Sequence, residues 1–225
     1  MRVSNYASLV VAASLITAVQ TSSASAAQSK NRKVVTHSSA AAELRQDMRR
    51  LWTDHVVWTR DYIIAAVGDQ PDAQAAAARL MRNQDDIGDA VGKFYGSAAG
   101  KQLTTLLKQH ISIAVDLIKA AKAGNKAEQQ QADTKWQQNA VDIADFLSKA
   151  NPNWPRATLV DMMKKHLATT TNEVVARLNK NWDEDVRAFD AVYDHILHMS
   201  DALSDGIVKQ FPEKFGGANE TTTSR

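Results

Sequence analysis

Six polar residues recur at nearly regular intervals along the sequence, one near the middle of each of six helix-like stretches: His55, Asn83, His110, Asn139, His166 and His195. Successive members are separated by 28, 27, 29, 27 and 29 residues, from the difference of their numbers. That spacing is close to one helix plus one turn. If consecutive helices run up and down, the middles of all six fall in one cross-section of a bundle. The spacing therefore predicts a polar layer at the centre of the bundle.

The residue types in this layer are those that bind transition metals. Asp86 and Asp142 each follow an asparagine by three residues, so that we expect each Asn/Asp pair to address one point. Neutral imidazoles with one or two carboxylates suit Zn, Fe, Mn or Cu, and helical bundles often hold such centres. The predicted metal ligands are His55, His110, His166, His195, Asp86 and Asp142, with Asn83 and Asn139 orienting them.

Two other interpretations of the layer stay open. It could be a purely structural network, in which Asn and Asp fix the histidine tautomers and the helix register. It could also hold a small anionic or polar organic ligand through protonated histidine. A buried polar group without a partner costs about 1 to 3 kcal/mol, so the layer must satisfy itself or bind something. No Glu-x-x-His, His-Glu-x-x-His or Gly-x-Ser-x-Gly motif occurs in the sequence, so we predict no particular reaction.

The elements that must position the layer are helices, because apolar residues recur at intervals of three and four. We expect helices from Ser38 or Ser39 to Gly68, over 72–92, from 100 to Gly124, over 125–148, from 155 to about 179, and from about 183 to 210. No strand pattern competes with them. The sequence predicts an all-α, up-and-down bundle of about six helices over residues 39–212.

Short matches within the chain indicate an internal duplication. "RNQDDIGDA" and "QNAVDIADF" share Asn, Asp and Ile at the same spacing, and each precedes a helix that carries one of the histidines. "WTDHVVWTRD" and "VYDHILHMSD" share Asp-His. These matches predict a twofold repeat that relates the second helix to the fourth, the third to the fifth and the first to the sixth.

The ends of the chain carry different signals. Residues 1–27 read as an export signal, with Arg2 before the apolar run "LVVAASLITAV" and small residues at the expected cleavage site. Residues 28–38 are polar and read as a linker, and residues 213–225 as a disordered tail. The mature chain is expected to be secreted, extracellular or periplasmic, without a membrane span. It contains no cysteine, so packing alone must hold its fold.

The charge pattern limits the partners. The formal charge is only +2, and the charges are spread along the helices, so we predict no nucleic-acid binding. The leading hypothesis is a secreted protein that binds a metal ion or small ligand in its central layer. The alternative is a non-enzymatic secreted interaction protein, or an effector that acts on a protein of a host or neighbouring cell, with a purely structural layer.

Four runs resemble a group of small, largely uncharacterised microbial secreted proteins that are all-helical: "LWTDHVVWTR", "LLKQHISIAVDLIKAAKAG", "NAVDIADFLSKANPNW" and "DGIVKQFP". The resemblance covers residues from about 40 to 215. It implies a helical fold and supplies no catalytic residue.

Overall fold

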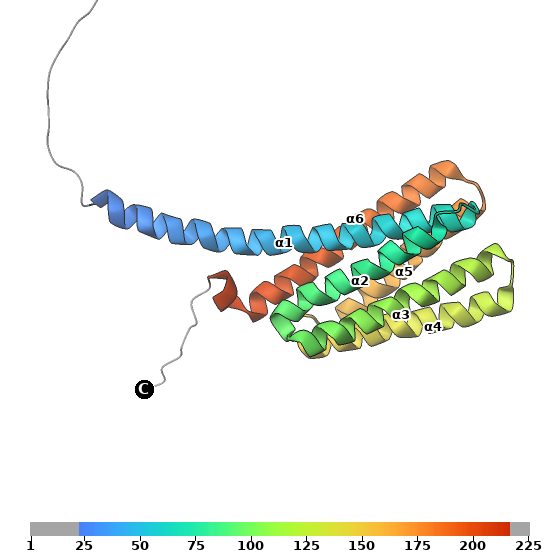
Figure 1. Ribbon diagram of the computed structural model, residues 1–225. Helices are drawn as coiled ribbons and strands as arrows, with labels where there is room; N and C mark the ends of the chain where they lie inside the picture. The colour runs from blue at the N-terminus through green and yellow to red at the C-terminus, as the bar shows by residue number, and fades with distance from the viewer. Residues whose placement is uncertain (1–22, 217–225) are drawn as a thin grey trace, which may run out of the picture. The chain divides into compact units, whose positions relative to one another are not determined.

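The computed structural model describes residues 23–216, and the side chains from residue 40 onward. Within that range the chain forms six α-helices, one 3-10 helix and no strand (Figure 1). The helices are α1 (Ser23–Val67), α2 (Ala73–Tyr95), α3 (Ser97–Lys122), α4 (Lys126–Ala150), α5 (Arg156–Leu178) and α6 (Trp182–Gln210), followed by the 3-10 helix η1 (Pro212–Phe215). The predicted all-α bundle is confirmed. Most of the predicted export signal and most of the predicted tail lie outside the described residues.

The helices pack in chain order. The bundle belongs to the compact unit that begins at His37. Within it α2 packs on α3, α3 on α4, α4 on α5 and α5 on α6 (Figure 1). Surface ion pairs from Arg45 to Asp205 and from Arg49 to Asp201 join α1 to α6. Short connections between antiparallel neighbours account for this arrangement.

The connection between α2 and α3 is shorter than predicted. Gly96 alone separates the two helices, and its φ of 88° lies in the left-handed region that glycine adopts without strain. The helices then pass so close that a Cβ atom added to Gly100 would lie 2.6 Å from the carbonyl oxygen of Gly88. Glycine at this crossing lets the two backbones touch.

Side-chain caps begin α4 and α6. Asn125 accepts a hydrogen bond from the amide of Glu128, and Asn181 accepts one from the amide of Glu184. The asparagine oxygens thereby satisfy amides that have no partner within the helix.

Two ends of the bundle differ from the sequence interpretation. α1 continues back through residues 28–38, which the sequence suggested as a linker. This segment contains Gln28, Lys30 and Arg32, straight-chain residues that favour helix. At the other end η1 occupies residues 213–215 of the predicted tail, because Phe215 stacks on Phe94 with ring centroids 5.9 Å apart.

None of the helices within residues 23–216 combines the length and the hydrophobicity that a membrane span requires.

Candidate functional site: a pocket above three buried histidines

The six residues predicted to form a layer are all buried. His166 lies among the other three histidines. Its ring centroid is 5.7 Å from that of His55, 6.2 Å from that of His110 and 6.2 Å from that of His195. The regular spacing in the sequence thus does correspond to a common depth in the bundle.

One hydrogen bond recurs in each helical hairpin. Polar side chains of α2, α4 and α6 donate to a backbone carbonyl of the preceding helix: Asn83 to Leu51 at 3.0 Å, Asn139 to Leu106 at 3.1 Å and His195 to Met162 at 2.9 Å. In each case that carbonyl lies four residues before the histidine of α1, α3 or α5. The histidines His55, His110 and His166 are themselves 55 and 56 residues apart. The recurring unit is one hairpin, and the predicted twofold duplication is not confirmed.

Asn139 sets the tautomer of His110. Its Nδ2 donates to the Leu106 carbonyl, so its Oδ1 must be the atom that faces His110 Nδ1, 2.7 Å away. An amide oxygen only accepts hydrogen bonds, so His110 Nδ1 carries the proton. In the neutral ring His110 Nε2 is therefore a bare lone pair.

His55 has the opposite tautomer. Gln84 Nε2 lies 3.3 Å from His55 Nδ1 and also donates to the carbonyl of Leu80 at 2.8 Å and to Asn83 Oδ1 at 3.2 Å. An amide nitrogen only donates, so His55 Nδ1 accepts and His55 Nε2 carries the proton. Gln84 is fully buried and was not among the predicted site residues, although it directly follows Asn83.

Burial keeps these imidazoles neutral. Desolvation lowers the pKa of His55 to about 3, that of His110 to about 4 and that of His166 well below the ordinary value of 6.5. Repulsion between neighbouring histidines lowers the pKa of His55 and His166 further. The charged form is disfavoured because a buried cation loses its hydration. At neutral pH the three rings are therefore uncharged. They offer lone pairs and N–H groups for hydrogen bonds, but no positive charge that would bind an anion.

A pocket of about 670 Å³ lies on one side of the layer, and we call it the histidine pocket. Its base includes His55, His110, His166, Trp136 and Thr170. Its walls are largely apolar, with Ile111, Ala114, Leu117, Ile118, Val174 and Leu178. Lys126 and Asn179, which are exposed at the ends of α4 and α5, also line it. The pocket therefore runs from the middle of the bundle to one end.

Small side chains leave this space open. The residues four positions after the three histidines are Thr59, Ala114 and Thr170, and all three line the histidine pocket. On the other side of the layer the corresponding turns carry larger residues such as Trp52, Leu107 and Met163, and only an apolar cavity of about 30 Å³ remains. Along α1, α3 and α5 the inward residues change from large before the histidine to small after it. This change in size indicates the pocket in the sequence, but an analysis of apolar periodicity does not detect it.

Four polar atoms at the base have no hydrogen-bond partner among the described residues: His110 Nε2, Trp136 Nε1, His166 Nδ1 and Thr170 Oγ1. Their residues are 3%, 3%, 5% and 4% exposed, respectively. The ring centroid of Trp136 lies 5.3 Å from that of His110, so the two rings that carry these atoms are neighbours. Unsatisfied buried polar atoms are uncommon in folded proteins, and four of the ten in the described part of the chain belong to side chains that line this pocket.

The two predicted carboxylate ligands do not join the layer. Asp86 is exposed and lies 3.8 Å from the guanidinium of Arg79, whereas Asp142 is exposed and accepts a hydrogen bond from Gln138. Three residues turn a helix by about 300°, so the side chain of Asp86 points about 60° away from that of Asn83. This rotation is towards the solvent side of α2, where Asp86 is exposed. The expectation that each Asn/Asp pair addresses one point was wrong. Within residues 23–216 no group of three or more histidine or acidic side chains is arranged to hold a metal ion.

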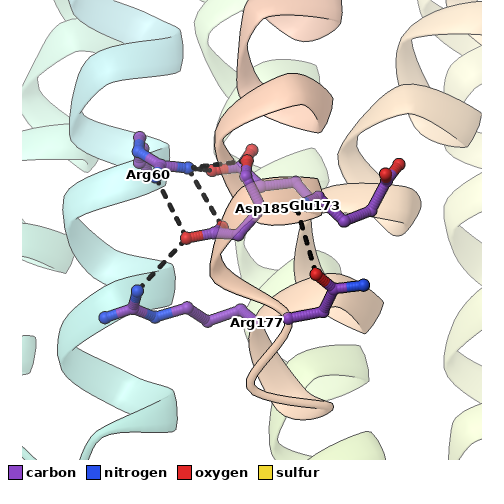
Figure 2. Close-up of polar contacts among 6 residues, drawn as sticks. Arg60, Glu173, Arg177 and Asp185 are labelled. Carbon is purple, nitrogen blue, oxygen red and sulfur yellow. Dashed lines mark hydrogen bonds and ion pairs between the residues drawn. The ribbon is translucent and has the colours of Figure 1, made fainter.

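A second buried polar cluster joins α1, α5 and α6. Arg60 donates to Glu173 at 2.8 Å and to Asp185 at 3.1 and 3.2 Å, and Arg177 donates to Asp185 at 3.1 Å. Figure 2 shows both guanidinium groups directed at the carboxylate of Asp185. Burial raises the pKa of Glu173 to about 7, although Arg60 opposes the shift. Glu173 does not line the histidine pocket, and this cluster serves to fasten three helices.

The chain matches no family model, no curated protein and no solved structure.

Proposed function

We propose that this protein binds a small molecule in the histidine pocket. The observation that carries the proposal is the set of four buried, unpartnered polar atoms at the pocket base. Each buried group left without a hydrogen bond costs about 1 to 3 kcal/mol, and a bound ligand would remove that cost. A purely structural layer would be expected to satisfy its own members.

The size and lining of the cavity support the same proposal. Small-molecule sites usually measure about 300 to 1,000 Å³ and combine apolar walls with a few polar groups. The histidine pocket, with about 670 Å³, has its polar groups at the base and its apolar residues on the walls. Neutral imidazoles would orient a ligand by hydrogen bonds, while the walls of α3 and α5 would cover its apolar part.

We further propose that the protein acts outside the cytoplasm, which rests on the predicted export signal. The alternative, a secreted interaction protein or effector, places activity on the outer surface. The two hypotheses predict different effects of a substitution that blocks the pocket. A ligand-binding protein would lose its activity, whereas an effector with a purely structural layer would keep it.

Titration with N-phenyl-1-naphthylamine tests the proposal, since this uncharged dye fluoresces on entering apolar sites. We expect saturable binding of one dye per chain. Ala114→Phe, which fills the pocket one turn above His110, should weaken binding at least tenfold, equivalent to about 1.4 kcal/mol. Ala127→Phe adds the same side chain at an exposed position of α4 and should leave binding unchanged. Circular dichroism and thermal unfolding of both variants check the fold. Equal dye binding by both variants contradicts the proposal.

A transition metal is the second candidate ligand, and His110 favours it. Its Nδ1–H is held by Asn139 and its Nε2 lone pair is free, which is the arrangement of a metal-bound histidine. His166 and His55 would have to move towards that nitrogen to complete a site. Asp86 and Asp142 are too exposed to contribute.

Elemental analysis after exposure to Zn, Fe, Mn or Cu tests this candidate. A near-stoichiometric metal that is lost in both His110→Ala and His166→Ala supports it. The metal should also leave on acidification, because protons compete for imidazole nitrogens. Protein that retains no metal from any of the four salts contradicts it.

A further inference from the structure

We infer that the ligand of the histidine pocket is an uncharged molecule with an apolar body and a head group that both donates and accepts hydrogen bonds. Alcohols, phenols and amides have such head groups. This inference rests on the proposed function, and it follows from the hydrogen-bonding state of three residues at the pocket base.

The requirement for a donor comes from His110. Asn139 holds its proton on Nδ1, so the unpartnered Nε2 presents only a lone pair. A ligand atom that meets this nitrogen must carry a hydrogen. A carboxylate, an ether or a ketone oxygen would place one lone pair against another.

The requirement for an acceptor comes from Trp136 and His55. The indole Nε1–H of Trp136 is buried and has no acceptor among the described residues, and it can only donate. Gln84 holds the proton of His55 on Nε2, which adds a second N–H group at the same base. A single hydroxyl group has one hydrogen and two lone pairs, which complement a bare ring nitrogen such as that of His110 and an N–H donor such as that of Trp136.

The absence of charge at the base excludes ionised head groups. The charged residues that line the pocket, Lys126 and Asp133, are both on α4, ten and three residues before Trp136, respectively. The three imidazoles of the base are neutral because they are buried. A carboxylate head carried to the depth of the imidazoles would lose its hydration without meeting a counter-charge.

The walls define the rest of the ligand. Between the base and the mouth α3 and α5 supply an aliphatic lining that includes Leu117, Ile118, Val174 and Leu178. Polar residues, mostly of α4, complete it: Gln129, Gln130, Asp133 and Thr171. An aromatic or aliphatic body would remove this surface from water. The order of groups along the pocket therefore places the polar head inward and the apolar body towards the mouth.

Isothermal titration with naphthalene, 2-naphthol and 2-naphthoate at pH 7 tests the inference, because the three share one body and differ in the head. We expect 2-naphthol to bind at least tenfold more tightly than either of the others, which corresponds to the value of one satisfied buried hydrogen bond. Trp136→Phe keeps an aromatic ring and removes the N–H donor. It should reduce the affinity for 2-naphthol several-fold and leave that for naphthalene unchanged. Trp182→Phe, at an exposed tryptophan, is the matched control and should change neither affinity.

The outcomes separate the ligand class from the proposed function. Equal affinity for naphthalene and 2-naphthol, or tighter binding of 2-naphthoate, overturns the inferred head group. If such binding is still lost in Ala114→Phe, the pocket remains a binding site. If none of the three compounds binds saturably to the wild type, both the ligand class and the proposed function fail.

Discussion

The Nδ1 atom of His110 lies 2.7 Å from the Oδ1 atom of Asn139, and this contact decides which nitrogen of the ring carries the proton and which is a lone pair. ¹⁵N spectra of the imidazoles should therefore show His110 protonated on Nδ1 at pH 7. Asn139→Leu removes both the acceptor for His110 and the donor for the Leu106 carbonyl. We expect it to lower the free energy of unfolding by about 2 to 4 kcal/mol, from two buried hydrogen bonds lost at once. Observation of the Nε2–H tautomer in the wild type would contradict the assignment.

Acid should destabilise the fold through the buried histidines. Their pKa values are below 6.5 in the folded protein, so between the folded and unfolded values the unfolded chain binds more protons. Stability contributed by the neutral rings is thus complete above pH 6.5 and decreases as the pH falls towards 4. Each ring adds a slope of up to about 1.4 kcal/mol per pH unit. Urea unfolding at pH 5, 6, 7 and 8 measures this dependence. His110→Phe should have the shallower slope, and an identical slope would contradict the prediction.

Glu173 should make the folded protein less stable as the pH rises, which is opposite to the effect of the buried histidines. Burial raises its pKa from 4.5 to about 7, so its protonated form is favoured in the folded protein. The stability from that form is present below pH 4.5 and is lost as the pH rises through 7. Glu173→Gln keeps a neutral side chain that can still accept from Arg60. Relative to the wild type the variant should gain up to about 3 kcal/mol in stability between pH 4.5 and 8. A difference in unfolding free energy that is independent of pH would contradict the raised pKa.

The close crossing of α2 and α3 predicts opposite effects at two glycines. Gly100→Ala places a Cβ atom 2.6 Å from the Gly88 oxygen and 3.0 Å from the Gly92 Cα atom, so backbone must move. We expect a loss of about 1 to 3 kcal/mol. Gly92→Ala meets its nearest atoms at 3.6 and 3.9 Å, an ordinary contact, and replaces glycine within a helix. It should gain up to about 1 kcal/mol. Thermal unfolding of both variants measures the contrast, and equal melting temperatures would contradict it.

The sequence predicts the helices and the depth of the polar layer, because both depend on periodicity along one chain. Asn83 and Asn139 were correctly placed inward by the apolar residues three and four positions away. Asp86 was wrongly placed with them, because spacing alone does not distinguish the two flanks of an inward residue. The pocket depends on side-chain volumes summed over several helices. The small residues Thr59, Ala114 and Thr170, each four positions after a histidine, are the part of that information that the sequence does carry.

The tautomers were outside the reach of sequence reasoning. They depend on which amide atom faces each ring, and this is settled by the carbonyl that accepts from the amide, on the preceding helix for Asn139 and within the same helix for Gln84. Leu106 and Leu80 supply those carbonyls, and neither is a residue whose type suggests a role in a site.

The hydrogen bond shared by the three hairpins has a consequence for how specificity can change. Repetition of the hairpin alone would give three imidazoles in the same hydrogen-bonding state. Such a site could not distinguish a donor from an acceptor atom of a head group. The imidazoles differ in their tautomers, because Gln84 contacts Nδ1 of His55 with an amide nitrogen and Asn139 contacts Nδ1 of His110 with an amide oxygen. Substitutions on α2 and α4 can therefore reverse the polarity of the base while every residue that lines the pocket stays the same. If the histidine pocket binds a ligand as proposed, its preference for a head group can therefore change while all three histidines are kept.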